Sequence, residues 1–220
     1  MLMTSLVIFD LDGTLLNSID DLGDATNYAL SQCGFPTHDI SAYPMFVGNG
    51  ITKLLERALP SECRENATIE KMRAHFLEYY DNHNTQYTKP YNGIPQLLKT
   101  LSSQGINLAV ASNKYHEAVV KLTKYYFPHE NWVAIEGHKN GIATKPDPAI
   151  VFNILQKCPT PKDQVLYIGD SGVDMDTACR AEIKSIGVTW GFRSEEELRA
   201  HNANYLANTP DEIYQIISKL

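Results

Sequence analysis

The 220-residue sequence has few cysteines, no run of basic residues and no long apolar segment. Its four cysteines lie far apart, and none shows the C-x-x-C spacing of redox or zinc sites. This usage is typical of a reduced, cytoplasmic protein, and we expect that location. No apolar stretch approaches the roughly 20 residues that span a bilayer. Residues 1–5 carry no positively charged side chain, so we also expect no secretory signal.

The balance of charge argues against one class of partner. Lysine and arginine number 19 against 26 aspartates and glutamates, which gives a net charge of −7. An acidic chain without a basic run is poorly suited to the phosphate backbone of nucleic acids. Repeats and low-complexity segments are also missing, and the length suits one domain, or one domain with an insertion. We therefore expect neither nucleic acid nor membrane as a partner, and the oligomeric state stays open.

Short apolar runs alternate with helical patterns over most of the chain. The run Leu6–Phe9 predicts a first buried strand. Later runs predict four more strands, at Asn107–Ala111, Trp132–Ile135, Val165–Ile168 and Ser185–Val188. Between them the apolar residues recur at helical spacing, as in Ile94–Leu101. This alternation predicts an α/β fold, with a Rossmann-like parallel sheet and helices on both of its faces.

One interval breaks the alternation. Between residues 16 and 88 the sequence shows helical patterns at Ile19–Leu30, Ile51–Leu59 and Ile69–Tyr80, and no convincing strand. More than seventy residues are too many for a simple crossover between strands. We therefore predict an α/β core domain of residues 1–15 and 89–220, with an inserted α-helical cap domain of residues 16–88. An insertion that directly follows the first strand should lie over the active site as a lid.

The segment Asp10–Leu15 places two carboxylates at the end of the first predicted strand. Open parallel sheets bind ligands beyond the carboxyl ends of their strands. Because side chains alternate along an extended chain, Asp10 and Asp12 can point to the same side. One can then attack an electrophile while the other moves a proton. A β-hairpin turn at Asp12–Gly13 is the competing interpretation, and the helical pattern after residue 18 disfavours it.

Two further strand ends carry polar residues. Ser112, Asn113 and Lys114 follow the second main strand, where a hydroxyl, an amide and backbone N–H groups can hold phosphoryl oxygens. Taken alone, Ser and Asn in this place are more often a helix N-cap. Lys145 precedes a proline, which favours extended backbone and fixes where the side chain leaves the chain. A lysine there can hold a phosphoryl oxygen and a carboxylate, although a single lysine is usually solvated.

Asp170 and Asp174 complete the polar set. Asp170 ends a predicted strand, and Asp174 returns to the same face one turn into the following helix. Carboxylates that converge at one sheet edge suit a hard cation such as Mg²⁺. Without a cation they would repel Asp10 and Asp12. The alternative is an ordinary helix start, where the helix dipole favours acidic residues.

In this order, D-x-D-G-T-L, S-N, K-P and G-D-S-x-x-D resemble the motifs of the haloacid dehalogenase-like hydrolases, and of their phosphatases in particular. The resemblance covers nearly the whole chain. It implies that Asp10 is the nucleophile, Asp12 the general acid/base, and Lys145 the lysine that steadies nucleophile and phosphate. Substrate contacts are implied for the polar residues Thr14, Ser112, Asn113 and Lys114. Metal ligation is implied for Asp10, the carbonyl of Asp12, Asp170 and Asp174.

The implied activity is a Mg²⁺-dependent phosphatase. Mg²⁺ and Lys145 would offset the repulsion between a carboxylate and a phosphate dianion. Asp10 would form an aspartyl-phosphate. Asp12 would protonate the leaving oxygen and then deprotonate water, a contribution of about 10²–10⁴ to the rate.

Within this family the chain is most similar to phosphoglycolate phosphatases, on the segments 46–51, 54–59, 90–93 and 112–114. Gly48, Asn49 and Gly50 at a helix start expose backbone donors that suit a small carboxylate, or they form an ordinary helix start. We therefore predict a small phosphate ester as substrate, with 2-phosphoglycolate first. Pyrophosphate and sugar phosphates, hydrolysed or isomerised, are the alternatives. From another class, a non-enzymatic phospho-aspartate signalling domain is disfavoured by its different motif order and by the insertion.

Overall fold

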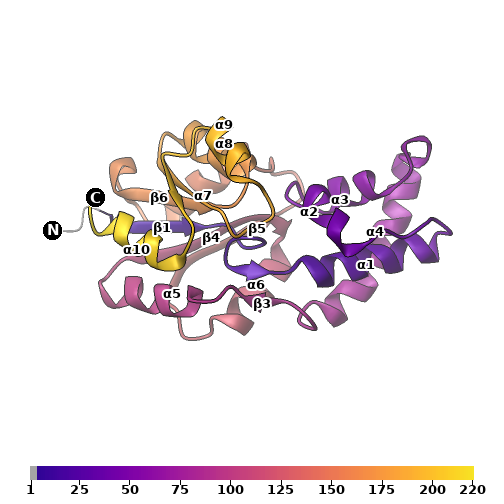
Figure 1. The fold of residues 1–220 in the computed structure, drawn as a ribbon, viewed down its shortest axis with the longest axis horizontal. Helices are drawn as coiled ribbons and strands as arrows, with labels where there is room; N and C mark the ends of the chain where they lie inside the picture. Colours follow the sequence, from indigo (N-terminus) through magenta and orange to yellow (C-terminus); the bar gives the residue numbers. More distant parts are fainter. Residues whose placement is uncertain (1–3) are drawn as a thin grey trace.

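A computed structural model describes residues 4–220 of the chain. Its central sheet has six parallel strands in the order β5-β4-β1-β6-β7-β8 (Figure 1). Their bounds are β1 (Leu6–Phe9), β4 (Asn107–Tyr115), β5 (Trp132–His138), β6 (Val165–Gly169), β7 (Lys184–Val188) and β8 (Tyr205–Ala207). The connecting helices are α5 (Ile94–Ser103), α6 (His116–Tyr126), α7 (Ala149–Lys157), α8 (Gly172–Ala181), α9 (Glu195–Ala200) and α10 (Pro210–Ile217).

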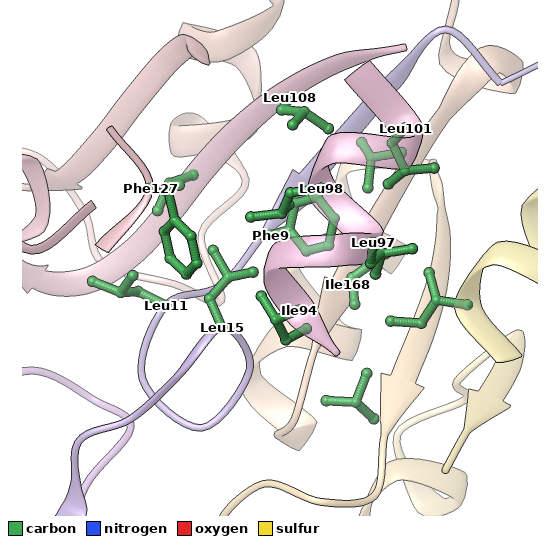
Figure 2. Packing of buried hydrophobic residues seen from close by; sticks show 14 of the residues in the cluster. Phe9, Leu11, Leu15, Ile94, Leu97, Leu98, Leu101, Leu108, Phe127 and Ile168 are labelled. Carbon is green, nitrogen blue, oxygen red and sulfur yellow. The ribbon is translucent and has the colours of Figure 1, made fainter. Parts of the chain in front are cut away.

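Alternate residues of β1 pack into two different apolar clusters. Val7 and Phe9 belong to a cluster with α5, α6 and α10, which Figure 2 shows around Phe9. Leu6 and Ile8 belong to a second cluster, with α7 and α8. Successive side chains of a strand point to opposite faces of the sheet, so helices cover both faces. The predicted α/β fold is thereby confirmed.

Residues 16–88 leave and rejoin the sheet through a short antiparallel ribbon. This ribbon joins β2 (Leu16–Asn17) to β3 (Lys89–Pro90). Between them lie α1 (Ile19–Gln32), α2 (Tyr43–Phe46), α3 (Ile51–Ala58) and α4 (Asn66–His83), grouped at one end of the molecule (Figure 1). Most of their buried apolar side chains form a cluster of their own. We call residues 16–88 the helical insertion.

A buried carboxylate ties the two ends of the insertion together. Asp21, in the first turn of α1, is 3% exposed. Its oxygens accept hydrogen bonds from the backbone N–H groups of Tyr87 and Thr88, each at 2.9 Å, and from the Thr88 hydroxyl at 2.6 Å. Hydrogen bonds to a charged acceptor are roughly twice as strong as neutral ones. The base of the insertion is therefore fixed.

The structure extends or changes several local predictions. β4 continues to Tyr115, and α6 begins only after it, so Ser112 and Asn113 lie in a strand and do not cap a helix. After Gly13 the chain forms a tight loop and then enters the insertion, which excludes the hairpin. The short strands β2, β3 and β8 were not predicted. The four cysteines are free. Among the described helices, none has the length and apolar character needed to cross a membrane.

Candidate active site

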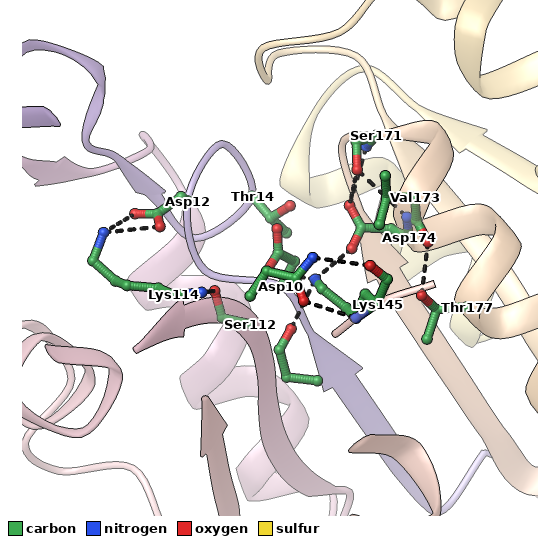
Figure 3. A network of polar contacts seen from close by, with 12 residues as sticks. Asp10, Asp12, Thr14, Ser112, Lys114, Lys145, Ser171, Val173, Asp174 and Thr177 are labelled. Atoms are coloured by element: carbon green, nitrogen blue, oxygen red, sulfur yellow. Dashed lines mark hydrogen bonds and ion pairs between the residues drawn. The ribbon is translucent and has the colours of Figure 1, made fainter. Parts of the chain in front are cut away.

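The carboxyl ends of β1, β4 and β6 meet at one edge of the sheet, and the helical insertion faces this edge (Figure 1). A cavity lies between the two. On the sheet side it is lined by six polar residues, Asp10, Asp12, Ser112, Asn113, Lys114 and Tyr115. The contacts among the polar side chains of this edge are drawn in Figure 3. The candidate site therefore combines charged groups of the core with a wall supplied by the insertion.

Asp10 follows β1 directly and is almost completely buried. Its Oδ1 lies 2.9 Å from Nζ of Lys145 (Figure 3). The pKa of Asp10 is raised to about 7: burial raises it most, Lys145 lowers it, and Asp174 and Asp12 add to the increase. A positive charge beside Asp10 is therefore needed to keep this carboxylate ionised and nucleophilic near neutral pH.

Lys145 supplies that charge from the loop before α7. Its Nζ donates to Oδ1 of Asp174 at 2.7 Å, to the carbonyl of Ala111 at 3.0 Å and to the hydroxyl of Tyr167 at 3.1 Å. Burial lowers the pKa of Lys145, but Asp10 and Asp174 outweigh it and raise this pKa well above its usual value. The lysine is therefore charged and held in one position. Tyr167 lies in the apolar strand β6 and contributes a buried hydroxyl. It was not predicted as part of the site.

Asp170 follows β6, and both of its carboxylate oxygens accept hydrogen bonds. Oδ1 accepts a hydrogen bond from the Thr14 hydroxyl at 3.1 Å, and Oδ2 accepts one from the backbone N–H of Phe192 at 2.8 Å. Gly13, with φ of +86°, passes so close that a Cβ there would lie 2.3 Å from Oδ2 of Asp170. Thr14 was predicted to contact substrate. It is instead fully buried behind Asp170 and does not line the cavity, so its hydroxyl positions a carboxylate.

Asp174 forms the start of α8. Ser171 caps this helix: its hydroxyl accepts from the backbone N–H of Asp174, and Oδ2 of Asp174 accepts from the backbone N–H of Ser171 at 3.1 Å. The Ser171 hydroxyl also lies 2.6 Å from the same oxygen. With Oδ1 bonded to Lys145, both oxygens of Asp174 have protein partners. Asp174 therefore completes the capping box of α8 and also belongs to the charged cluster.

Three carboxylates of the site fit a divalent cation. One oxygen each from Asp10, Asp170 and Asp174 lies within 4.8 Å of the others, and all three residues are buried. Burial raises the pKa of Asp170 well above its usual value, and repulsion from Asp174 and Asp10 adds to the increase. A cation would relieve that repulsion. Buried oxygen ligands of this kind suit a hard metal ion. The geometry therefore supports a metal site formed by these aspartates.

Asp12 points away from this cluster, into the cavity. Lys114 Nζ donates to its two oxygens at 3.0 and 2.9 Å, and the Ser18 hydroxyl donates to Oδ1 at 2.6 Å. Ser18 precedes α1, but its side chain makes no cap hydrogen bond there. The carboxylate predicted to move a proton thus lies beside the predicted substrate lysine. The sequence did not indicate a role for Ser18 in the site, because a serine directly before a helix is typical of an N-cap.

Ser112 and Asn113 lie on the cavity wall, at the end of β4. Asn113 Nδ2 donates to the carbonyls of Gly48 and Lys145, each at 3.2 Å, and its Oδ1 accepts from the backbone N–H of Lys145 at 2.8 Å. One amide therefore holds both the Lys145 loop and the edge of the insertion. Among residues 4–220, the Ser112 hydroxyl accepts only a long bond, 3.3 Å, from the backbone N–H of Lys114, so it is open to a ligand.

The three insertion residues predicted to contact substrate do not behave alike. Gly48 and Gly50 line the cavity, whereas Asn49 does not. The Oδ1 atom of Asn49 instead accepts a hydrogen bond from Arg57 at 2.7 Å. Gly50 is the N-cap of α3, without a side-chain cap. Its backbone donors are therefore the part of this segment that can reach a ligand.

Arg193, on the loop after β7, holds the insertion against the core. Its guanidinium donates to the backbone carbonyls of Pro44 and Val47, the latter at 2.7 Å. On the other side of the cavity, the Tyr115 hydroxyl bonds the carboxylate of Asp81 on α4. These bridges were not predicted, because they join segments far apart in the sequence and follow no local pattern. Together with Asn113 they keep the insertion closed over the sheet edge.

The site is a buried acidic cluster at the edge of a parallel sheet, and comparison with known proteins gives the family of the chain. The sequence model of the haloacid dehalogenase-like hydrolases matches residues 7–188. The chain belongs to this family, as its motifs indicated. Because a hydrolase family matches most of this chain, the alternative of a phospho-aspartate signalling domain is disfavoured.

Individual relatives narrow the class to phosphatases. The chain is 29% identical to the phosphoglycolate phosphatase of Aquifex aeolicus, over 96% of this chain and 95% of that protein. A crystal structure from Lactobacillus delbrueckii subsp. bulgaricus, of a candidate phosphoglycolate phosphatase, has a TM-score of 0.90 and 32% identity, covering 97% and 98% of the two chains. A structure from Haemophilus somnus, of a predicted phosphoglycolate phosphatase, has a TM-score of 0.91 and 26% identity, covering 98% and 99%.

Proposed function

We propose that this protein is a Mg²⁺-dependent phosphatase that hydrolyses 2-phosphoglycolate to glycolate and phosphate. The observation that carries the proposal is the convergence of Asp10 and Asp12 at one cavity closed by the insertion, with Nζ of Lys145 2.9 Å from Asp10. Asp10, the carbonyl of Asp12 and Asp170 would hold the metal, with Asp174 direct or one shell further out. A bound cation would offset the negative charge of the carboxylates and the phosphoryl group.

Asp10 is the proposed nucleophile. Its carboxylate attacks phosphorus, and the bond to the leaving oxygen breaks as the aspartyl-phosphate forms. Lys145 lies 2.9 Å from Oδ1 of Asp10 and offsets the charge that gathers between nucleophile and phosphate. Ser112, on the same wall, provides a hydroxyl that orients a phosphoryl oxygen. Asn113, whose amide is bonded to Gly48 and Lys145, keeps the Lys145 loop in place.

Asp12 is the proposed general acid and base. It protonates the leaving oxygen, and in the second step it takes a proton from the water that attacks the aspartyl-phosphate. Without substrate its carboxylate is paired with Lys114. An anionic leaving group would compete for this ammonium group, which would free an oxygen of Asp12 for proton transfer. Lys114 is therefore assigned to the substrate's carboxylate.

The insertion acts as the cap of the site in this proposal. Its bridges to Arg193, Asn113 and Tyr115 close the cavity, which excludes water from the reacting groups and large substrates from the nucleophile. The carboxylate of 2-phosphoglycolate would lie between Lys114 and the backbone donors of Gly48 and Gly50. A small phosphate ester with an anionic leaving group fits this arrangement.

The test is a comparison of kcat/KM values for purified protein with Mg²⁺. The substrates are 2-phosphoglycolate, pyrophosphate, a hexose phosphate and ethyl phosphate, with phosphate release as the readout. We expect 2-phosphoglycolate to be hydrolysed with the highest kcat/KM. A higher value for pyrophosphate or the hexose phosphate would leave the phosphatase chemistry standing and overturn the substrate.

A further inference from the structure

The insertion's wall of the cavity is apolar apart from one hydroxyl group. Among the described residues, five apolar side chains form this wall: Leu22, Val47, Ile51, Leu54 and Phe76. Two glycines and Tyr80 complete it. Specificity in a pocket comes from a few placed polar groups, so polar recognition by a side chain of the insertion falls to Tyr80.

The hydroxyl of Tyr80 is buried without a hydrogen-bond partner in the described part of the chain. The residue is 0% exposed. A buried hydroxyl that makes no hydrogen bond loses its contacts with water and gains nothing in return. Nearly all buried polar side-chain atoms in native proteins have a partner. Tyr80 lines the cavity, so a ligand that binds there is the candidate partner of its unpaired hydroxyl.

Tyr80 lies beside the groups assigned to substrate and proton transfer. Nζ of Lys114 is 4.8 Å from the centre of its ring, and Lys114 in turn bonds Asp12. The ring stacks on Phe76 with centres 5.2 Å apart, which fixes its orientation. Burial raises the pKa of Tyr80 well above its usual value, and Asp12 is the largest of the charges that add to this. The hydroxyl keeps its proton and can donate to an anion.

We propose that Tyr80 is a specificity-determining residue whose hydroxyl donates a hydrogen bond to a carboxylate oxygen of the substrate's leaving group. Lys114 provides the positive charge beside it. The inference rests on the function proposed above and adds the side chain by which the insertion distinguishes an anionic leaving group from an apolar one. The apolar remainder of the wall gives no hydrogen bond to a sugar's hydroxyls.

The test uses the Tyr80→Phe variant and two esters of nearly equal size. In ethyl phosphate a methyl group replaces the carboxylate of 2-phosphoglycolate. We expect the variant to lower the ratio of the two kcat/KM values, 2-phosphoglycolate over ethyl phosphate, about ten- to a hundredfold, as for a lost hydrogen bond to a charged group. The loss should lie mainly in KM for 2-phosphoglycolate, while ethyl phosphate hydrolysis stays within about twofold.

Tyr43→Phe is the matched control. Tyr43 is also fully buried in the insertion, but its hydroxyl donates to Asn27 at 2.7 Å and it does not line the cavity. We expect this control to lower Tm and keep the substrate ratio. Tyr80→Phe should keep or raise Tm, because it removes an unpaired group. A substrate ratio that is unchanged in Tyr80→Phe, or a Tm that falls as in the control, assigns the hydroxyl to a structural partner and overturns the proposal.

The two proposals fail in different ways. If the wild-type protein hydrolyses ethyl phosphate as well as 2-phosphoglycolate, the proposed substrate is wrong, and the role of Tyr80 falls with it. If the wild-type protein prefers 2-phosphoglycolate and Tyr80→Phe keeps the same preference, only the role of Tyr80 is overturned.

Discussion

The core and the insertion contribute to the cavity by different physical means. The core supplies buried charges around Lys145, which contacts Asp10, Asp174 and two neutral oxygens. The insertion supplies an apolar wall, backbone groups and one unpaired hydroxyl. This difference suggests a division of work, in which the core determines the chemistry and the insertion determines which leaving group is accepted.

Burial costs explain why the work is divided in this way. A buried charge is tolerated only when it is paired and hydrogen-bonded, and the ends of neighbouring parallel strands bring such partners together. The insertion is joined to the core by one ribbon and a few bridges, such as that of Arg193. If it opens to admit substrate, apolar surface and single hydrogen bonds are the contacts that break and re-form at low cost. Changes in the core should therefore affect all esters alike, and changes in the insertion should depend on the leaving group.

The largest effect is expected from removing the nucleophile. Asp10→Asn should lower kcat at least about 10³-fold for every ester, and the fold should persist because the change removes a buried charge. Phosphate release and thermal unfolding check this. The control is Asp163→Asn. Asp163 is an exposed residue of the α/β core domain, so this variant should behave as wild type. Steady turnover by Asp10→Asn, after deamidation back to Asp has been excluded, would contradict the assignment.

Removing the metal should also affect all esters alike. A chelator should abolish turnover, and Mg²⁺ should restore it and raise Tm, because it relieves repulsion among Asp10, Asp170 and Asp174. Ca²⁺ should support turnover poorly, because its larger, looser shell misplaces the nucleophile. Full activity in excess chelator would rule out the site.

Thr14→Val removes the hydroxyl that holds Asp170 and should weaken Mg²⁺ affinity about 10–100-fold. Calorimetric titration measures that affinity directly.

The sequence revealed the chemistry of the core because that chemistry lies at strand ends. Asp10, Asp170 and the Ser112–Asn113 pair each follow an apolar run, so the local pattern places them at one edge. The pattern cannot show what a side chain bonds across the fold. Thr14 was therefore predicted to contact substrate although it lies behind Asp170, and Ser18, which bonds Asp12, was not predicted to belong to the site.

In the insertion, the periodicity of apolar residues predicted helices but not the contacts between them. Tyr80 falls within a predicted helix, where an aromatic residue at helical spacing reads as core. The Tyr80 hydroxyl is important because it has no hydrogen-bond partner in the described part of the chain. A sequence pattern does not show such an absence. The edge strand β8 has three residues, too short for a recognisable alternation. The bridge of Arg193 joins residues almost 150 positions apart.

A smaller effect, limited to the insertion, is expected at Gly50. Its φ of +81° is unfavourable for a residue with a side chain, and an added Cβ would lie 3.1 Å from the carbonyl oxygen of Asn113. Gly50→Ala should push the segment from the sheet edge and raise KM for 2-phosphoglycolate about tenfold. Turnover of a minimal phosphoryl donor should change less. Gly34→Ala, with φ of +77° and open space around it, is the control. Equal losses with both substrates would contradict the division of work.

The smallest effect concerns an ion-pair cluster of the core. Burial raises the pKa of Glu136, but hydrogen bonds from Lys157 and Lys139 outweigh it and hold this pKa below its usual value of 4.5. A carboxyl with a lowered pKa stabilises the fold above its unfolded pKa, and this contribution disappears as the pH falls through the folded pKa. Glu136→Gln should therefore lower the free energy of unfolding by about 1 kcal/mol at pH 7, with the difference shrinking below about pH 4. Urea unfolding across this pH range measures it. Because Glu136 touches neither cavity wall, the kcat/KM ratio of the esters should not change, and a change in that ratio would mean that the core also selects the leaving group.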